Sequence, residues 1–201
     1  AARGVRLFRF GFIDRKGEWA IKPAFAFVEA FADDRALVNK GGKWAWGRRL
    51  FGGAWGFIDR KGALAVEAVY EKAHPFSEGL AAVRKDGLWG YIDVHGKEVG
   101  APAFAKAKDF RDGLAVVRAK GKKTGVIDTT GAFVIPPDYD AILPFAHGTA
   151  VMRKGLLYGV IDRTGKVLRE PDIAQMGEWS EGLVGVRFDM SGPWGFMNRK
   201  G

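Results

Sequence analysis

With 201 residues, the chain is long enough for one ordinary domain or one array of repeats. The absence of cysteine excludes disulfide bonds and thiolate chemistry, and no apolar run reaches the length of a membrane-spanning helix. The net charge of +9 favours an anionic partner or surface.

A short motif recurs six times along the chain. Glycine follows an aromatic residue or Thr, a hydrophobic pair and Asp or Asn come next, and a second glycine lies six residues after the first. The first pairs are Phe10-Gly11, Trp55-Gly56, Trp89-Gly90, Thr124-Gly125, Tyr158-Gly159 and Trp194-Gly195, and the second glycines are Gly17, Gly62, Gly96, Gly131, Gly165 and Gly201. Self-similarity of this kind indicates a tandem-repeat protein.

A second motif precedes most copies of the first. It reads F-S-E-G-L-A-A-V-R at residues 76–84, and it recurs at 110–118, at 145–153, at 179–187 and more loosely at 31–39. Its anchors lie 17 residues after the preceding second glycine, at Asp34, Gly79, Gly113, Gly148 and Gly182. The two motifs divide residues 1–201 into a single array of six units of roughly 34 residues, with cores near 1–33, 34–78, 79–112, 113–147, 148–181 and 182–201.

These residues resemble the bacterial WG-repeat (KWG-repeat) proteins. The resemblance rests on the W-G-F/Y-I-D-x-x-G motif, the F-S-E-G-L-A-x-V motif and prolines near expected strand ends (Pro23, Pro102, Pro137 and Pro171), and it covers essentially the whole chain. Phe10, Thr124 and Tyr158 replace Trp in three copies, so that position tolerates change. The resemblance implies a β-repeat fold and almost nothing about mechanism.

The elements of one unit are clearest in the third copy. We expect a strand over residues 80–85, a two-residue type I′ turn at Asp86-Gly87 and a return strand over 88–93. A type I turn over 93–96 then leads to a third strand over 97–101, which Pro102 should stop because it cannot donate to a ladder. The stretch from there to Gly113 should be irregular or a single helical turn, so one unit is predicted to be a three-stranded antiparallel meander.

The turn at Asp86-Gly87 fixes which residues face one another. It pairs Arg84 with Trp89, Ala82 with Tyr91 and Leu80 with Asp93, and it makes both faces of the sheet largely apolar. Such sheets need neighbouring repeats on both sides, and glycines of the Gly90 type would allow close approach between sheets. We therefore predict an all-β fold with the meanders stacked as an open β-solenoid. The alternative is a closed, β-propeller-like array.

All variation in repeat length lies in one place, the turn between the two motifs. The interval from the second-motif anchor to the next W-G glycine is 11, 12, 11 and 13 residues in copies three to six and 22 in copy two. These turns, taken as residues 6–9, 39–54, 85–88, 119–123, 154–157 and 188–193, hold eleven Lys and Arg against two Asp, which equals the net charge of the whole chain. Insertions and charge that gather on one rim often mark a binding face.

The longest of these turns combines aromatic, cationic and glycine residues. Such a mixture suits phosphates, acidic sugars or stacked bases. The predicted ligand-binding residues are Lys43, Trp44, Trp46, Arg48, Arg49 and Phe51 in this turn and Lys120, Lys122 and Lys123 in a later one. The alternative is a hairpin extension whose aromatic side chains fold back on a neighbouring repeat.

Three columns of repeated residues have a structural explanation beside a functional one. Asp14, Asp59, Asp93, Asp128 and Asp162 are predicted to hold turns through Asx hydrogen bonds rather than to bind a cation. Arg84, Arg118, Arg153 and Arg187 could form a basic ladder for a polyanion, or stack on cross-strand aromatic rings and pair with carboxylates. The Trp residues of the motif are expected in the core.

No catalytic, metal-binding or cofactor-binding pattern is present. His74, His95 and His147 lie at three different repeat phases, and there is no nucleophile elbow or phosphate-binding loop. We therefore expect a non-enzymatic interaction scaffold for an acidic protein surface, a glycan or a cell-envelope polymer. The alternatives are nucleic-acid binding and a structural spacer or accessory domain of a larger enzyme or filament. No caps are evident, so self-association through the ends is possible. No signal peptide is seen, and the compartment stays open, with the bacterial envelope or exterior favoured.

Overall fold

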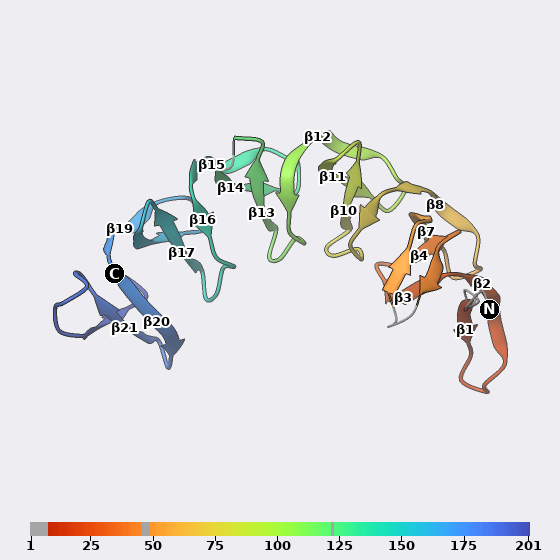
Figure 1. Ribbon diagram of the computed structural model, residues 1–201, viewed down its shortest axis with the longest axis horizontal. Helices are drawn as coiled ribbons and strands as arrows, with labels where there is room; N and C mark the ends of the chain where they lie inside the picture. Colours follow the sequence, from red (N-terminus) through yellow and green to blue (C-terminus); the bar gives the residue numbers. More distant parts are fainter. Residues whose placement is uncertain (1–7, 46–48, 122) are drawn as a thin grey trace, which may run out of the picture. The chain divides into compact units, whose positions relative to one another are not determined.

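The computed structural model describes residues 8–45, 49–121 and 123–201. The only secondary-structure elements in this part of the chain are β-strands, as the repeat pattern predicts (Figure 1). The chain divides into two compact units, Ala1–Gly113 with Thr129–Gly131, and Leu114–Asp128 with Ala132–Gly201. Each unit contains antiparallel meanders, and none of the sheets closes on itself.

The first unit contains the strands of the first three repeats. They are β1 (Phe10–Ile13), β2 (Trp19–Phe25), β3 (Phe27–Ala32), β4 (Arg35–Lys40), β5 (Lys43–Ala45), β6 (Arg49–Phe51), β7 (Ala54–Ile58), β8 (Leu64–Tyr70), β9 (Lys72–Ala73), β10 (Leu80–Lys85), β11 (Leu88–Asp93) and β12 (Glu98–Ala107). The strand orders are β1-β2, β3-β4-β7-β8 and β9-β10-β11-β12, and β5-β6 form a separate ribbon.

The second unit contains the strands of the last three repeats. They are β13 (Leu114–Ala119), β14 (Thr124–Asp128), β15 (Phe133–Tyr139), β16 (Ala141–Ile142), β17 (Thr149–Lys154), β18 (Leu157–Asp162), β19 (Val167–Ile173), β20 (Gln175–Ser180), β21 (Leu183–Arg187) and β22 (Gly195–Asn198). The strand orders are β13-β14-β15, β16-β17-β18-β19 and β20-β21-β22.

The prediction of a three-stranded meander was wrong, because the repeat contains one more strand. An additional strand precedes the anchor residue of the second motif, and in four repeats it is β3, β9, β16 or β20. This strand lies in the stretch that is predicted to be irregular or helical. The strand turns into the next one at Glu78-Gly79, where both residues have positive φ (56° and 78°). Two positive values identify a type I′ hairpin turn. A complete repeat is thus a four-stranded sheet.

The central hairpin of the third repeat agrees with the prediction. Arg84 pairs with Trp89, Ala82 with Tyr91 and Leu80 with Asp93. The turn residues Asp86 and Gly87 have φ values of 51° and 76°, as a type I′ turn requires. In the following turn the Gly96 N–H donates to the Asp93 carbonyl at 2.9 Å.

Proline does not end the last strand of the repeat, contrary to expectation. β12 runs from Glu98 to Ala107 and so continues past Pro102, and β2, β15 and β19 also contain prolines. Each of these strands is bulged there. In the fifth repeat Tyr158 pairs with Ile173 and Val160 pairs with Arg169, so a step of two residues along β18 is matched by a step of four along β19. A bulge removes residues from the ladder, so a missing N–H costs nothing at that point.

The bulge explains the glycine that follows the aromatic residue. A Cβ on Gly56 would lie 2.7 Å from the Val66 carbonyl oxygen and 2.7 Å from the Ala68 Cα, both on the adjacent strand. The equivalent Gly159 is as close to the backbone of β19. The close approach is therefore to the bulged neighbour in the same sheet, whereas the sequence suggested approach between sheets.

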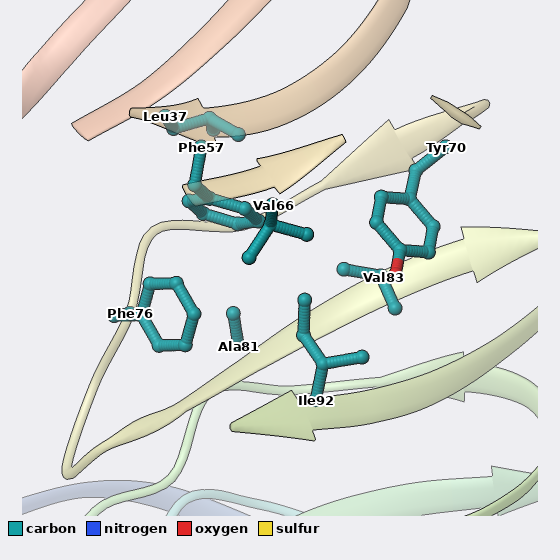
Figure 2. Close-up of a cluster of buried hydrophobic side chains, with 8 residues drawn as sticks. All are labelled: Leu37, Phe57, Val66, Tyr70, Phe76, Ala81, Val83 and Ile92. Carbon is teal, nitrogen blue, oxygen red and sulfur yellow. The ribbon is translucent and has the colours of Figure 1, made fainter. Parts of the chain in front are cut away.

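The hydrophobic core lies between successive sheets. Figure 2 shows one cluster in the first unit, to which one sheet contributes Leu37, Phe57, Val66 and Tyr70 and the next contributes Phe76, Ala81, Val83 and Ile92. The alternate residues Ala36, Val38 and Ile58 of the first sheet pack instead on Ile21 and Phe25 of the preceding repeat. Both faces of this sheet are covered, as its apolar pattern predicts.

Candidate interaction surface on the hairpin turns

The turns between the second and third strand of each repeat are here called the hairpin rim. In the described chain they comprise residues 39–45 and 49–54, 85–88, 119–121 with 123, 154–157 and 188–193. The turn between β17 and β18 has positive φ only at Gly155 (64°), as in a type II′ turn, and pairs Lys154 with Leu157. Short turns of this kind place their central residues at the end of a sheet, in solvent.

The arginine column serves the turns themselves. The Arg153 Nη1 donates to the Gly155 carbonyl at 2.7 Å, and the Arg187 Nε donates to the Gly192 carbonyl at 2.8 Å. Arg187 also lies over the Trp194 ring, 5.5 Å from its centroid. Arg84 approaches Glu71, with Nε 3.4 Å from Oε2. The Arg187–Trp194 and Arg84–Glu71 contacts are of the stacking and pairing kind that was one of the two alternatives, whereas the bonds to turn carbonyls were not expected. All of these contacts involve guanidinium groups that a polyanion would need.

Lysines, by contrast, extend into solvent at the ends of the second strands. Lys40, Lys85 and Lys154 end β4, β10 and β17, and Lys120 follows β13. All four are exposed, and within the described residues no ion pair involves any of them. Amines of this kind can meet an external anion without first breaking an internal contact.

Lys123, one of the predicted ligand-binding residues, has an internal partner. Its Nζ lies 2.6 Å from Asp140 Oδ1, and the other oxygen of that carboxylate accepts a hydrogen bond from the Gly155 N–H at 2.6 Å. The hydrogen bond from Lys123 is the main cause that lowers the pKa of Asp140, and the Gly155 N–H adds to it. Lys123 therefore helps to hold the neighbouring turn. Lys120 is exposed, and Lys122 lies outside the described residues.

The inserted turn of the second repeat forms the ribbon β5-β6. The Trp44 Nε1 donates to the Ala26 carbonyl at 2.7 Å, and its ring lies 6.1 Å from that of Phe10 and 6.4 Å from that of Phe27. Trp44 is half-buried. This aromatic residue folds back on neighbouring strands, as the alternative interpretation of the turn predicted.

A buried asparagine fixes the base of the same ribbon. The Asn39 Oδ1 accepts from the Gly42 N–H at 3.1 Å, and its Nδ2 donates to the Gly52 carbonyl at 3.4 Å. Asn39 is completely buried, and such a polar group needs these partners. The insertion therefore has a defined anchor at its base.

The remaining predicted ligand residues of this ribbon differ in accessibility. Lys43 and Phe51 face each other in register and are both exposed. Arg49 pairs through its backbone with Ala45. Trp46 and Arg48 lie outside the described residues.

The hairpin rim of the second unit also carries large apolar side chains that sequence reasoning overlooked. The exposed fractions are 85% for Leu156 and 65% for Met190. Their position in a turn that otherwise favours polar residues was the available signal. Trp194, expected in the core, is 56% exposed, whereas Trp55 and Trp89 are half-buried beside the bulged strands β8 and β12. The sheet β20-β21-β22 has no such strand next to Trp194.

The aspartate column holds turns, as predicted. The Asp59 Oδ1 accepts from the backbone N–H groups of Lys61 at 2.8 Å and Ala63 at 3.0 Å. Equivalent bonds form at Asp14, Asp93, Asp128 and Asp162 and at Asn198 in the sixth copy. Within the described chain no three His, Asp or Glu side chains are grouped as a metal site. The same residues include no helix of the length and apolarity needed to cross a membrane.

Solved structures that are similar to this chain have low sequence identity to it. A computationally designed protein, Ika8, is 14% identical, with 98% of this chain and 75% of that chain covered and a TM-score of 0.42. Hsv2p of Kluyveromyces lactis is 12% identical, with 83% and 59% covered and a TM-score of 0.47. BamB of Moraxella catarrhalis is 13% identical, with 85% and 60% covered and a TM-score of 0.40. This chain spans less than two thirds of the latter two structures.

The sequence matches no curated protein. The model of the family described as "WG containing repeat" matches it five times, at residues 10–44, 55–89, 89–123, 125–155 and 158–189. These matches cover most of the chain, and each begins within an aromatic-glycine or Thr-Gly pair of the first motif. The chain therefore belongs to the WG-repeat family.

Proposed function

We propose that this protein is an interaction scaffold with no reaction of its own, and that its hairpin rim binds an anionic partner. The observation that carries the proposal is the difference between the two kinds of cation at the rim. Arginines are engaged with the turns, whereas Lys40, Lys85, Lys120 and Lys154 are exposed without an ion pair in the described structure. Within each unit, exposed amines at equivalent places in successive repeats offer a repeated site for a repeated anion, such as an acidic polymer or an acidic protein face.

The charge distribution supports the same proposal. The hairpin turns carry a net charge of +9 in the sequence, and the rest of the chain is balanced. A partner attracted by long-range charge would therefore meet the rim first. Such binding weakens as salt screens the charges over a Debye length of roughly 10 Å at 0.1 M.

The test is elution of the purified chain from immobilised heparin, a sulfated polyanion, in a salt gradient. The variant K40Q/K85Q/K120Q/K154Q removes four rim charges. The matched control K16Q/K61Q/K97Q/K166Q removes four exposed lysines from the turns at the other end of the sheets. We expect the rim variant to elute at clearly lower salt and the control to elute close to the unmodified chain. Equal shifts for the two variants would show that only total charge matters, and the rim would lose its assigned role.

A further inference from the structure

Two consecutive turns of the hairpin rim in the second unit expose large apolar side chains. The first turn holds Leu156 and Leu157, with exposed fractions of 85% and 38%. The second holds Phe188 at 50% and Met190 at 65%, and Trp194 follows it at 56%. Single exposed apolar residues are ordinary, but four on two consecutive turns of one unit, with Trp194 directly after the second turn, are exposure of the kind that marks an interaction site.

The rim turn of the third repeat also has a two-residue tip and does not share this feature. The corresponding tip in the third repeat is Asp86-Gly87, and the leucine after it, Leu88, is half-buried. In the fifth repeat the corresponding tip is Gly155-Leu156, and almost the whole side chain of Leu156 is exposed to solvent. The fold thus accommodates a polar tip, and Leu156 contributes nothing to the core.

Cationic groups lie behind these apolar residues. Lys154 precedes the first tip, and Arg153 and Arg187 are hydrogen-bonded to carbonyl groups within the two turns. Arg169 lies over the Phe188 ring, 4.8 Å from its centroid. This pattern of apolar tips with a cationic base is typical of structures that enter the boundary between lipid headgroups and acyl chains.

Three carboxylates share this surface, and each is internally engaged. Asp140 is paired with Lys123 and accepts from the Gly155 N–H of the first turn at 2.6 Å. The Ser191 hydroxyl donates to Asp189 and is the main cause that lowers the pKa of this carboxyl. The backbone N–H groups of Ser191 and Gly192 also donate to Asp189 and lower its pKa further. Asp172 is paired with Arg169. With Lys123 included, five cationic side chains against three carboxylates leave the patch with an excess of two positive charges, which an anionic surface complements.

We infer that the turns at 154–157 and 188–193 bind an anionic lipid surface by inserting Leu156 and Met190 between the headgroups. This inference rests on the proposed function, since it names the partner class for the rim of the second unit. A lipid surface suits the geometry better than a folded protein does. A side chain that is 85% exposed at the apex of a turn needs either a matching pocket or a fluid medium that closes around it. Trp194, beside Arg187, has the amphipathic character of residues at membrane interfaces.

The experiment measures co-sedimentation of the chain with vesicles. One set contains phosphatidylcholine alone and the other phosphatidylcholine mixed with phosphatidylglycerol. We expect binding to the mixed vesicles only, and a loss of about tenfold or more in apparent affinity for the variant L156Q/M190Q, because each inserted side chain contributes through its buried apolar area. The control L143Q/L183Q changes two exposed leucines that lie outside these turns, and it should bind as the unmodified chain does.

The outcomes separate this inference from the proposed function. L156Q/M190Q should keep its elution position on heparin, because it removes no charge, whereas K40Q/K85Q/K120Q/K154Q should lose both heparin and vesicle binding. Heparin binding without any vesicle binding overturns the lipid inference and leaves the proposed function standing. Equal vesicle binding by L156Q/M190Q and the unmodified chain overturns it as well. Binding of an acidic amphipathic peptide that depends on Leu156 and Met190, in the absence of vesicle binding, would assign the patch to a protein partner.

Discussion

At the scale of single residues, the two glycines of the WG motif are needed for different reasons. The second glycine, as at Gly96, has a positive φ of 83°. A Cβ added to Gly96 would lie 3.3 Å from a side-chain carbon of Val66 in the preceding repeat. The first glycine is needed because the bulged strand passes directly over it. In the sixth copy the described residues contain no strand after β22, and no described atom lies within 4 Å of an ideal Cβ on Gly195.

This difference predicts unequal effects for the same substitution within one unit. Gly159→Ala places a methyl group 2.5 Å from the Arg169 carbonyl oxygen and should lower the free energy of unfolding by about 1–3 kcal/mol. Gly195→Ala meets no atom and should change it by less than about 0.5 kcal/mol. Urea denaturation followed by tryptophan fluorescence measures both. A similar loss in the two variants would mean that the glycine serves something other than the bulge.

A second residue-scale prediction concerns the His74–Asp109 pair. His74 Nδ1 lies 2.6 Å from Asp109 Oδ1, and its ring lies 4.9 Å from that of Trp89. The His74 hydrogen bond is the main cause that lowers the pKa of Asp109 from its ordinary value of 3.8, and the charges of His74, Arg111 and Lys108 add to it. A lowered carboxyl pKa stabilises the folded state above the unfolded-state value, and this contribution is lost as the pH falls through the folded-state value.

His74→Phe keeps a ring beside Trp89 and removes the hydrogen bond. The pKa of Asp109 should then rise toward its ordinary value, and the variant should be less stable than the unmodified chain at neutral pH. The difference should shrink as the pH falls below 3.8, because Asp109 becomes protonated in both proteins. An NMR titration of the Asp109 carboxyl carbon measures the shift directly. An unchanged titration curve would assign the low pKa to the neighbouring cations.

At the scale of elements, the sequence predicted the central hairpin correctly and missed the strand before it. Asp86-Gly87 was identified as a type I′ turn because alternating apolar residues flank it on both sides. Glu78-Gly79 has the same backbone, but only two residues of a first strand, Lys72–Ala73, precede it as β9, so no alternation is visible. The bulge was missed for a related reason. Proline predicts the end of a strand, whereas in this fold the neighbouring ladder re-forms beyond the bulge.

The turn after the W-G strand predicts a clear distinction between two substitutions of Asp59. Asp59→Ala removes the oxygen that accepts from Lys61 and Ala63 and should lower the free energy of unfolding by about 1 kcal/mol. Asp59→Asn keeps an acceptor and should be close to neutral, since Asn198 already accepts from the Lys200 N–H at 2.9 Å in the equivalent turn. Thermal unfolding with and without calcium measures both points. Stabilisation by calcium that Asp59→Asn abolishes would instead indicate a cation site.

At the scale of the whole molecule, the candidate site shows why sequence reasoning identified a region better than its individual residues. The spacing of the motifs was enough to locate the hairpin rim and its positive charge. It could not tell Arg153, which bonds to its own turn, from Lys154, which extends into solvent, because that choice depends on side-chain geometry. It could not show that Lys123 is paired with Asp140, which lies in the next repeat. Exposure of Leu156 and Met190 likewise becomes visible only when the strands are in place.

Successive repeats are also joined by hydrogen bonds between their turns. The Glu78 carboxylate accepts from the Asp112 N–H at 2.6 Å and from the Gly113 N–H at 2.8 Å in the following repeat. The Asp33 carboxylate accepts from the Gly79 N–H at 2.8 Å in the same way. In a linear array such nearest-neighbour contacts determine how strongly the folding of one repeat supports the next.

The contact between these turns leads to a prediction with a closely matched control. Glu78→Ala leaves two backbone N–H groups without their acceptor, and their hydrogen exchange should become about fivefold faster, as expected for the loss of about 1 kcal/mol. Glu181 occupies the same turn position with a similar φ, 47° against 56°, and in the described chain no N–H donates to its carboxylate. Glu181→Ala therefore reports the cost of the backbone conformation alone and should leave exchange at Asp112 and Gly113 unchanged. If Glu78→Ala also left these two amides unaffected, the hydrogen bonds from Glu78 would contribute nothing measurable to the coupling of these two repeats.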